Sequence, residues 1–225
     1  MKQYGLIFDM DNTILDTHID FKEMHRRTAD SARRFGREEK GLEVPDFSAW
    51  AVAEIIKWAV EQGISQQKVD ALWQTVAEVE ADGMRDIVKE QGVEAALDRL
   101  AAAGNYLVVL TNNSLRAARL AMENSGLMPY FQEVHARDEY QELKPSPKGI
   151  LSIMAENPQV DAWLMLGDSW LDGQAALRAG IPFAAYGSLS AEYWREHQLR
   201  PNLFLRNWDQ AKPELLRRVM DEAAR

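Results

Sequence analysis

Short apolar runs that alternate with helical patterns are the feature of this sequence that most limits its fold. The runs cover residues 4–9, 106–110, 162–166 and 181–185. Each has the length of one buried strand, and the stretches between the later runs have helical periodicity. This alternation is typical of a parallel sheet covered by helices. We therefore predict an α/β fold.

The helices between these strands carry their own start and stop residues. Ser114 can cap the N-terminus of one helix, and Ser146 can cap another that has Pro147 in its first position. Three glycines mark expected helix ends, because glycine adopts the left-handed backbone conformation that closes a helix: Gly104, Gly126 and Gly180.

Residues 18–88 interrupt the alternation, because no run with strand character occurs among them. Instead they contain three amphipathic patterns, whose apolar faces are formed by Phe21, Met24, Thr28, Ala32 and Phe35; by Trp50, Ala51, Glu54, Ile55 and Trp58; and by Val69, Leu72, Trp73 and Val76. Three such faces can bury one another in a small bundle. We predict an inserted helical domain here.

Composition excludes several classes of partner. The net charge of −9 argues against a nucleic-acid backbone or an anionic membrane, since both require a dominant basic surface. The chain has no cysteine, so it has neither a disulfide framework nor a thiolate metal site. Its first apolar run, Leu6–Phe8, is too short for a signal peptide or a membrane span. We expect a cytoplasmic protein.

Four polar segments follow the apolar runs or lie close behind them: Asp9–Thr13, Thr111–Asn112, Lys144–Pro145 and Gly167–Asp172. In an open parallel sheet the carboxyl ends of the strands share one rim, and ligands bind in the crevice outside it. The four segments can therefore meet around one small ligand.

Each segment has a chemical interpretation and a simpler one. Asp9 and Asp11 can divide the roles of nucleophile and general acid/base, or they can form a solvated turn. Asp168 suits a hard cation such as Mg²⁺, but it can also cap a helix. Thr111 can cradle a phosphate group or cap a helix. Lys144 can bind phosphate oxygens or simply lie on the surface.

Taken in order, the four segments resemble the haloacid dehalogenase-like hydrolase superfamily. Its pattern is an Asp-x-Asp-x-Thr loop, a Thr or Ser after the second core strand, a Lys, and a Gly-Asp with another Asp a few residues on. The resemblance covers the whole chain and is strongest to the phosphoglycolate phosphatase-like group, which has a helical cap between the first two motifs. It implies a Rossmann-like parallel core of residues 1–17 and 89–225, and a helical cap domain of residues 18–88.

The resemblance also implies roles for individual residues. Asp9 would be the nucleophile that forms an aspartyl-phosphate, and Asp11 the acid that protonates the leaving group and later the base that activates water. Asp9, Asp168 and the main-chain carbonyl of Asp11 would hold Mg²⁺. Asn12 stands where glycine is most frequent in the family, but asparagine tolerates the same left-handed conformation.

Further residues would support these groups. Thr111, the amides near Asn112 and Lys144 would stabilise charge on the transferring phosphoryl oxygens. Asp172, which would orient metal-bound water or Lys144, and Thr13 would lie just outside the direct ligands. The retained Asp11 argues against dehalogenase chemistry, because a leaving halide needs no proton.

We therefore expect a Mg²⁺-dependent phosphatase of a small phosphorylated metabolite, phosphoglycolate-like or a sugar phosphate, acting as a monomer or homodimer. Three alternatives remain open at this point: a phosphomutase of the beta-phosphoglucomutase type, an inorganic pyrophosphatase, and a phospho-acceptor signalling receiver. The sequence does not show which residues of the helical insertion contact the substrate.

Overall fold

The structure is a computed structural model that describes residues 2–84, 87–139 and 142–223. The chain divides into two compact units, Met1–Thr17 with Ile87–Arg225, and His18–Asp86. The unit boundary thus falls at residue 86, two residues before the position expected from the sequence. Residues 88 and 89 instead belong to a short strand of the first unit.

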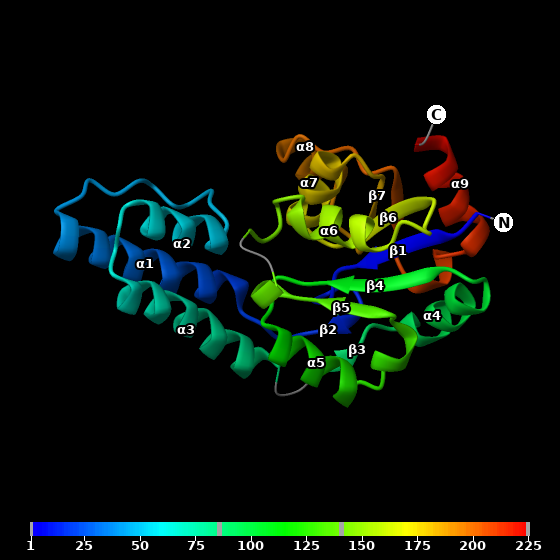
Figure 1. Cartoon of the computed structure of the whole chain (residues 1–225), viewed down its shortest axis with the longest axis horizontal. Helices are drawn as coiled ribbons and strands as arrows, with labels where there is room; N and C mark the ends of the chain where they lie inside the picture. Colours follow the sequence, from blue (N-terminus) through cyan, green and yellow to red (C-terminus); the bar gives the residue numbers. More distant parts are fainter. Residues whose placement is uncertain (1, 85–86, 140–141, 224–225) are drawn as a thin grey trace. The chain divides into compact units, whose positions relative to one another are not determined.

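A parallel six-stranded sheet forms the centre of the first unit (Figure 1). Its order is β5-β4-β1-β6-β7-β8, made of β1 (Tyr4–Phe8), β4 (Tyr106–Leu110), β5 (Glu133–His135), β6 (Ala162–Gly167), β7 (Phe183–Tyr186) and β8 (Leu203–Leu205). Since β4 and β6 flank β1 on opposite sides, the chain reverses its direction of winding at β1. Ligands bind at such a switch point in open α/β sheets. The α/β prediction is confirmed.

Helices cover both faces of this sheet (Figure 1). They are α4 (Val93–Ala102), α5 (Leu115–Asn124), α6 (Lys148–Glu156), α7 (Trp170–Ala179), α8 (Ala191–Glu196) and α9 (Pro213–Ala223), with single 3₁₀ turns at Met128–Tyr130, Arg137–Glu139 and Trp208–Gln210. Residues of the central strands are buried on both faces, which explains why these strands read as continuous apolar runs.

Most of the predicted helix boundaries hold. The Ser114 hydroxyl accepts a hydrogen bond from the Ala117 amide, and Gly180 ends α7 in the left-handed conformation. One start is wrong by a residue, because α6 begins at Lys148 and the Pro147 carbonyl accepts its first helical bond. Ser146 therefore precedes the capping position.

A two-stranded antiparallel ribbon connects the first unit to the inserted segment. β2 (Leu15–Asp16) pairs with β3 (Val88–Lys89), so that Leu15 lies opposite Lys89 and Asp16 opposite Val88. The chain leaves the first unit at Thr17 and re-enters it at Ile87, and the ribbon brings these two residues close together. The segment between them is thus inserted at one point of the first unit.

The second unit consists of three helices, α1 (Phe21–Lys40), α2 (Val52–Glu61) and α3 (Gln66–Gly83). All three contribute to one apolar core. The predicted faces are largely right, but Phe21 is 44% exposed, and Trp50 and Ala51 precede α2. Arg27, at the flank of the first face, pairs with Glu78 at 2.8 Å.

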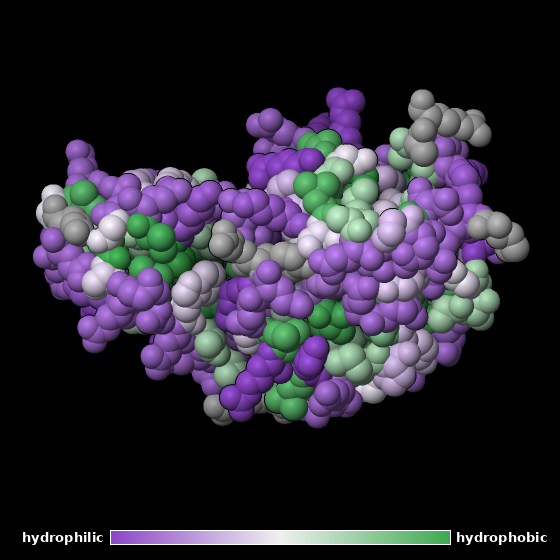
Figure 2. All heavy atoms as spheres, viewed as in Figure 1, coloured by the Kyte–Doolittle hydropathy of each residue, from purple (hydrophilic) through white to green (hydrophobic). Residues whose placement is uncertain are grey.

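Hydrophilic residues predominate on the face drawn in Figure 2, and hydrophobic residues form scattered patches among them. Among the described residues, no helix is both long enough and apolar enough to cross a membrane.

Candidate active site

Lys144 joins two carboxylates at the carboxyl rim of the sheet. Its Nζ lies 2.6 Å from Asp9 Oδ1 and 2.6 Å from Asp172 Oδ1, and all three residues are buried. Burial alone would lower the pKa of Lys144, but the charges of Asp172 and Asp9 outweigh it and raise that pKa. The lysine therefore stays protonated and fixes the position of Asp9 Oδ1.

The two carboxylate oxygens of Asp9 have different surroundings. Within the described residues, Asp9 Oδ2 has no hydrogen-bond partner, whereas Oδ1 is held by Lys144. Asp9 comes directly after β1, and its amide donates to the Leu166 carbonyl of β6 at 2.9 Å. Two neighbouring strands thus fix the backbone behind this carboxylate.

Asp9, Asp168 and Asp172 form a compact group of carboxylates. One oxygen from each lies within 4.8 Å of the others. Burial, followed by the charge of Asp172, raises the pKa of Asp9 to about 7, and burial together with Asp9 and Asp172 raises that of Asp168. Both pKa shifts thus arise first from burial and then from neighbouring negative charge that Lys144 opposes but does not balance. Hard oxygen donors crowded in this way suit Mg²⁺.

Asp11 has a different environment, although it lies only two residues from Asp9. Its Oδ1 accepts a hydrogen bond from the Thr17 hydroxyl at 2.9 Å, and its Oδ2 accepts one from Asn113 Nδ2 at 2.6 Å. Burial is the main cause of the raised pKa of Asp11, and the two hydrogen bonds oppose it. A carboxyl whose pKa is raised is suited to donate a proton near neutral pH.

The loop after β4 supports both Asp11 and Lys144. The Asn112 side chain accepts from the Lys144 amide and donates to the Lys144 carbonyl, both at 3.0 Å. The Asn112 side chain therefore holds the backbone of Lys144 at both its amide and its carbonyl. The buried Thr111 hydroxyl accepts from the Asn113 amide at 3.2 Å. Since Ser114 caps α5, Thr111 is not the helix cap.

The turn from β6 into α7 holds Asp172 in place. Asp172 Oδ2 accepts from the Ser169 amide at 3.1 Å and from the Ser169 hydroxyl at 2.6 Å, while Oδ1 binds Lys144. Both oxygens are thus engaged, which favours a supporting role for Asp172. Ser169 is the capping residue of α7, so Asp168 is not the cap and its carboxylate remains available.

The loop Asp9–Thr13 turns tightly behind the two aspartates. The amides of Ile14 and Leu15 both donate to the Met10 carbonyl at 3.0 Å. Asn12 adopts φ 53°, the left-handed conformation anticipated for this position. Trp208 Nε1 donates to the Thr13 carbonyl at 2.9 Å, whereas the buried Thr13 hydroxyl has no partner among the described residues.

Sequence analysis missed four residues that hold this site together. Thr17 and Asn113 bind Asp11, Ser169 binds Asp172, and the Tyr193 hydroxyl accepts from the Trp170 amide at 3.3 Å. Ser169 lies within the segment Gly167–Asp172 and Asn113 adjoins the segment Thr111–Asn112, so that both could have been suggested by their position. Tyr193 has no such signal, because α8 reaches the turn only through the tertiary fold.

The sequence matches the haloacid dehalogenase-like hydrolase family over residues 6–186, and the chain belongs to this family. Membership agrees with the order of the four segments and with their convergence at one rim. It also leaves the signalling-receiver alternative without support.

Curated relatives with similar sequences are phosphatases. The phosphoglycolate phosphatase of Rhodobacter capsulatus is 27% identical over 186 residues, which cover 81% of this chain and 83% of that protein. Pyrophosphatase PpaX of Bacillus velezensis is 24% identical over 184 residues, covering 80% and 81%. These relatives place the chain among the phosphatases of the family.

Solved structures share the fold at low sequence identity. A predicted phosphoglycolate phosphatase from Haemophilus somnus 129PT superposes with a TM-score of 0.61 at 16% identity, covering 96% of this chain and 98% of that one. A HAD-superfamily hydrolase of subfamily IA from Geobacter sulfurreducens PCA gives 0.54 at 20% identity, covering 97% and 96%.

Proposed function

We propose that this protein is a Mg²⁺-dependent phosphatase that hydrolyses the phosphate monoester of a small metabolite, phosphoglycolate-like or a sugar phosphate. The observation that carries the proposal is that two neighbouring aspartates, Asp9 and Asp11, have different hydrogen-bond partners. Lys144 holds one oxygen of Asp9 and leaves the other free, while neutral donors hold both oxygens of Asp11. Such a pair can act as nucleophile and as acid/base.

In the first half of the reaction, Asp9 Oδ2 attacks phosphorus in line with the leaving oxygen. A new P–O bond forms to Asp9, the ester P–O bond breaks, and Asp11 gives its proton to the departing alkoxide. Lys144, the Thr111 hydroxyl and the amides near Asn112 stabilise the charge on the phosphoryl oxygens, since phosphoryl transfer depends mainly on positioning and electrostatics.

In the second half, Asp11 acts as a base. It takes a proton from water, the water oxygen bonds to phosphorus, and the bond between phosphorus and Asp9 breaks. Phosphate leaves, Asp9 is again a carboxylate, and Asp11 is again protonated. The hydrogen bonds from Thr17 and Asn113 keep Asp11 oriented through both halves.

Asp9, Asp168 and the main-chain carbonyl of Asp11 would hold Mg²⁺, and the crowded carboxylates described above fit a hard cation. When bound, Mg²⁺ offsets the repulsion between an anionic nucleophile and an anionic phosphate. Asp172 and Thr13 support the site from behind these ligands.

We further propose that the helical unit of residues 18–86 acts as a cap that selects the substrate and excludes water during the first half-reaction. Its arginines are partly engaged within the unit, as the Arg27–Glu78 pair illustrates. A cytoplasmic location and a monomeric or dimeric state remain predictions.

The test is phosphate release from a panel of phosphorylated sugars, phosphoglycolate, nucleotides and pyrophosphate, with Mg²⁺ and with a chelator. Release should require Mg²⁺ and vanish in Asp9→Asn. Asp16→Asn is the matched control, because Asp16 is an exposed aspartate on β2 and should leave the rate unchanged. Substantial release by Asp9→Asn would refute the nucleophile assignment.

The same panel separates the remaining alternatives. The similarity to a pyrophosphatase is the reason for including pyrophosphate, and a preference for it over every ester would replace the proposed substrate class. Release that occurs only with an activating sugar bisphosphate, with phosphate returned to the sugar, would identify a phosphomutase.

A further inference from the structure

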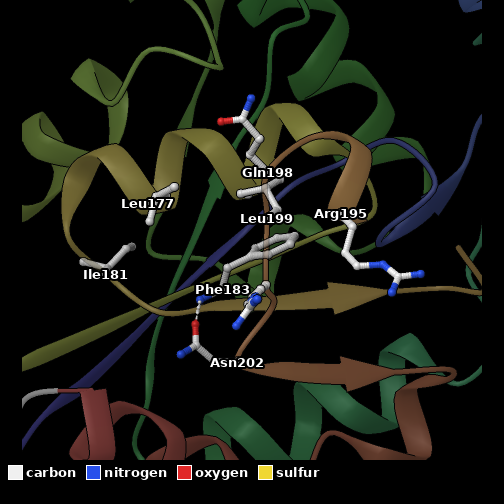
Figure 3. Close-up of a pocket in the computed structure, with 9 residues that line it drawn as sticks. Leu177, Ile181, Phe183, Arg195, Gln198, Leu199 and Asn202 are labelled. Carbon is white, nitrogen blue, oxygen red and sulfur yellow. Dashed lines mark hydrogen bonds between the residues drawn. The ribbon is translucent and has the colours of Figure 1, made fainter. Parts of the chain in front are cut away.

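A second pocket of the first unit lies away from the catalytic residues, between α7, β7 and the segment that links α8 to β8 (Figure 3). Its volume is about 410 Å³, within the range of small-molecule sites. The active site uses Asp168 and Asp172 at the N-terminal end of α7. The pocket is lined by Gly173 and Leu177 of the same helix and by Ile181 just beyond it. A Cβ at Gly173 would meet Leu199 and Phe183 of the pocket, whereas the neighbouring Asp172 binds Lys144 and Ser169 of the active site. The two sites therefore lie on different faces of α7.

One part of the pocket is apolar. Phe183 and Leu199 are 4% and 5% exposed and form its floor, and Leu177 and Ile181 lie to one side of Phe183 in Figure 3. Leu177 is 60% exposed, the highest value among the large hydrophobic residues of the described chain. A ligand that covered Leu177 would bury apolar surface that now faces water.

The other part offers hydrogen-bond donors and positive charge. Arg195 and Arg200 both line the pocket, and neither forms an ion pair or a side-chain hydrogen bond within the described residues. By contrast, Arg26 and Arg33 on α1 pair with neighbouring acids. Two unpaired guanidinium groups at one pocket are notable in a chain with a net charge of −9.

Asn202 adds a donor with a fixed orientation. Its Oδ1 accepts from the Phe183 amide at 3.0 Å, a bond drawn in Figure 3, and its own amide donates to the Phe183 carbonyl at 2.8 Å. The side-chain NH₂ group has no hydrogen-bond partner among the described residues and remains available as a donor. Charge and donors thus lie beside an apolar floor.

We propose that this pocket binds a small organic anion whose acidic group contacts Arg195 and Arg200 and whose apolar body lies on Phe183, Leu199 and Leu177. Guanidinium groups match both carboxylate and phosphoryl oxygens in a two-pronged geometry, so either acidic group satisfies this chemistry. The ligand is distinct from the proposed substrate, since it occupies a different face of α7.

Binding is measured directly, without turnover, on the full chain with Mg²⁺. Phenylacetate and the non-hydrolysable phenylphosphonate are the two anionic probes, and they distinguish a carboxylate from a phosphoryl ligand. Phenylacetamide tests the need for charge, and acetate tests the need for an apolar body. Amide chemical shifts in NMR spectra report where each probe binds, and calorimetry gives the affinity.

At least one aromatic anion should bind and shift the amides of Leu177, Phe183 and Asn202. Arg195→Gln and Arg200→Gln should each weaken that binding about tenfold or more, the usual scale for a lost hydrogen bond to a charged group. Arg206→Gln, which removes an exposed arginine outside the pocket, should not, and neither should Asp9→Asn. Unchanged melting temperatures would show that the variants are folded.

Three outcomes would overturn the proposal: no binding by either anion, equal binding by phenylacetamide, or anion binding that both arginine variants leave intact. Equal binding by acetate would likewise contradict the role of the apolar floor. Because Asp9→Asn removes only the proposed catalysis, failure of the proposed function and failure of this binding site are seen in different experiments.

Discussion

At the scale of single residues, the site depends on giving two like groups different surroundings. Asp9 faces a buried lysine and two further carboxylates, while Asp11 faces a hydroxyl and an amide. In the proposed mechanism, environment rather than residue type thus separates the nucleophile from the acid/base, as in other enzymes that use paired carboxyl groups. Lys144 is essential to this difference, because it is the cation that Asp9 and Asp172 share.

Replacing Asp11 by Asn should reduce kcat by about 10²–10⁴-fold, the scale of a lost acid/base group. The fold should survive, because the new asparagine can keep both hydrogen bonds. Its NH₂ group can donate to the Thr17 hydroxyl, and its amide oxygen can accept from Asn113. Steady-state kinetics and a melting curve test both parts. Asp16→Asn serves as the control, and a kcat equal to that of the wild type would show that another group transfers the proton.

At the scale of elements, the turn from β6 to α7 positions the carboxylates of Asp168 and Asp172, and the backbone and side chains are tightly packed there. A Cβ at Gly167 would lie 2.5 Å from Asp172 Cγ, so no larger residue fits without moving that side chain. The helix that follows begins with the Ser169 cap, which also binds Asp172. Strand end, cap and carboxylate thus form one rigid unit.

Gly167→Ala should therefore lower both activity and stability. Overpacking typically costs about 1–3 kcal/mol, and here the strain would displace Asp172 from Lys144. Gly149→Ala is the comparison: its Cβ would meet the end of the Leu110 side chain at 2.9 Å, away from the carboxylates. Urea unfolding should show losses in both variants, but kcat should fall markedly only in Gly167→Ala. Full activity in Gly167→Ala would mean that Asp172 tolerates displacement.

At the scale of the whole molecule, the first unit contains every residue assigned to the chemistry and has a core of its own. Replacing residues 18–86 by Asn-Gly should give a folded protein, because β2 and β3 already hold Thr17 and Ile87 at neighbouring positions of a hairpin. Circular dichroism and urea unfolding test this. We expect phosphate release to continue with less discrimination among substrates, and an unfolded or aggregated product would contradict the independence of the unit.

The free energy of unfolding should also depend on pH and should decrease as Asp9 ionises. The folded state raises the pKa of Asp9 from 3.8 to about 7, so folding favours the protonated form. This contribution is fully present below about pH 4 and is lost as pH rises through 7. In a chelator, the urea midpoint of the wild type should fall between pH 5 and 8, and the fall should be smaller in Asp9→Asn. Saturating Mg²⁺ should make the urea midpoint fall less steeply with pH, because the cation binds the ionised form of its carboxylate ligands. A flat wild-type profile in the chelator would contradict this account.

Local patterns in the sequence were sufficient for the four central strands β1, β4, β6 and β7, most helix boundaries and the segments at the strand ends. They did not predict the three-residue edge strands β5 and β8. Buried parallel strands leave continuous apolar runs, and Gly180 or Ser114 ends or begins a helix through its own backbone and hydroxyl. The left-handed conformation of Asn12 could likewise be anticipated, because only a few residue types adopt it without cost. These properties belong to one residue and its immediate neighbours.

Only the tertiary structure decided which groups hold the site. Asn113 reaches Asp11 across 102 positions, Lys144 reaches Asp9 across 135, and the Asn112 side chain holds the backbone of Lys144 across 32. The pocket with Arg195 and Arg200 is likewise formed by segments from three elements. Hydrogen bonds and ion pairs depend on distances of a few ångströms, which chain order does not specify until the sheet has brought its strands together.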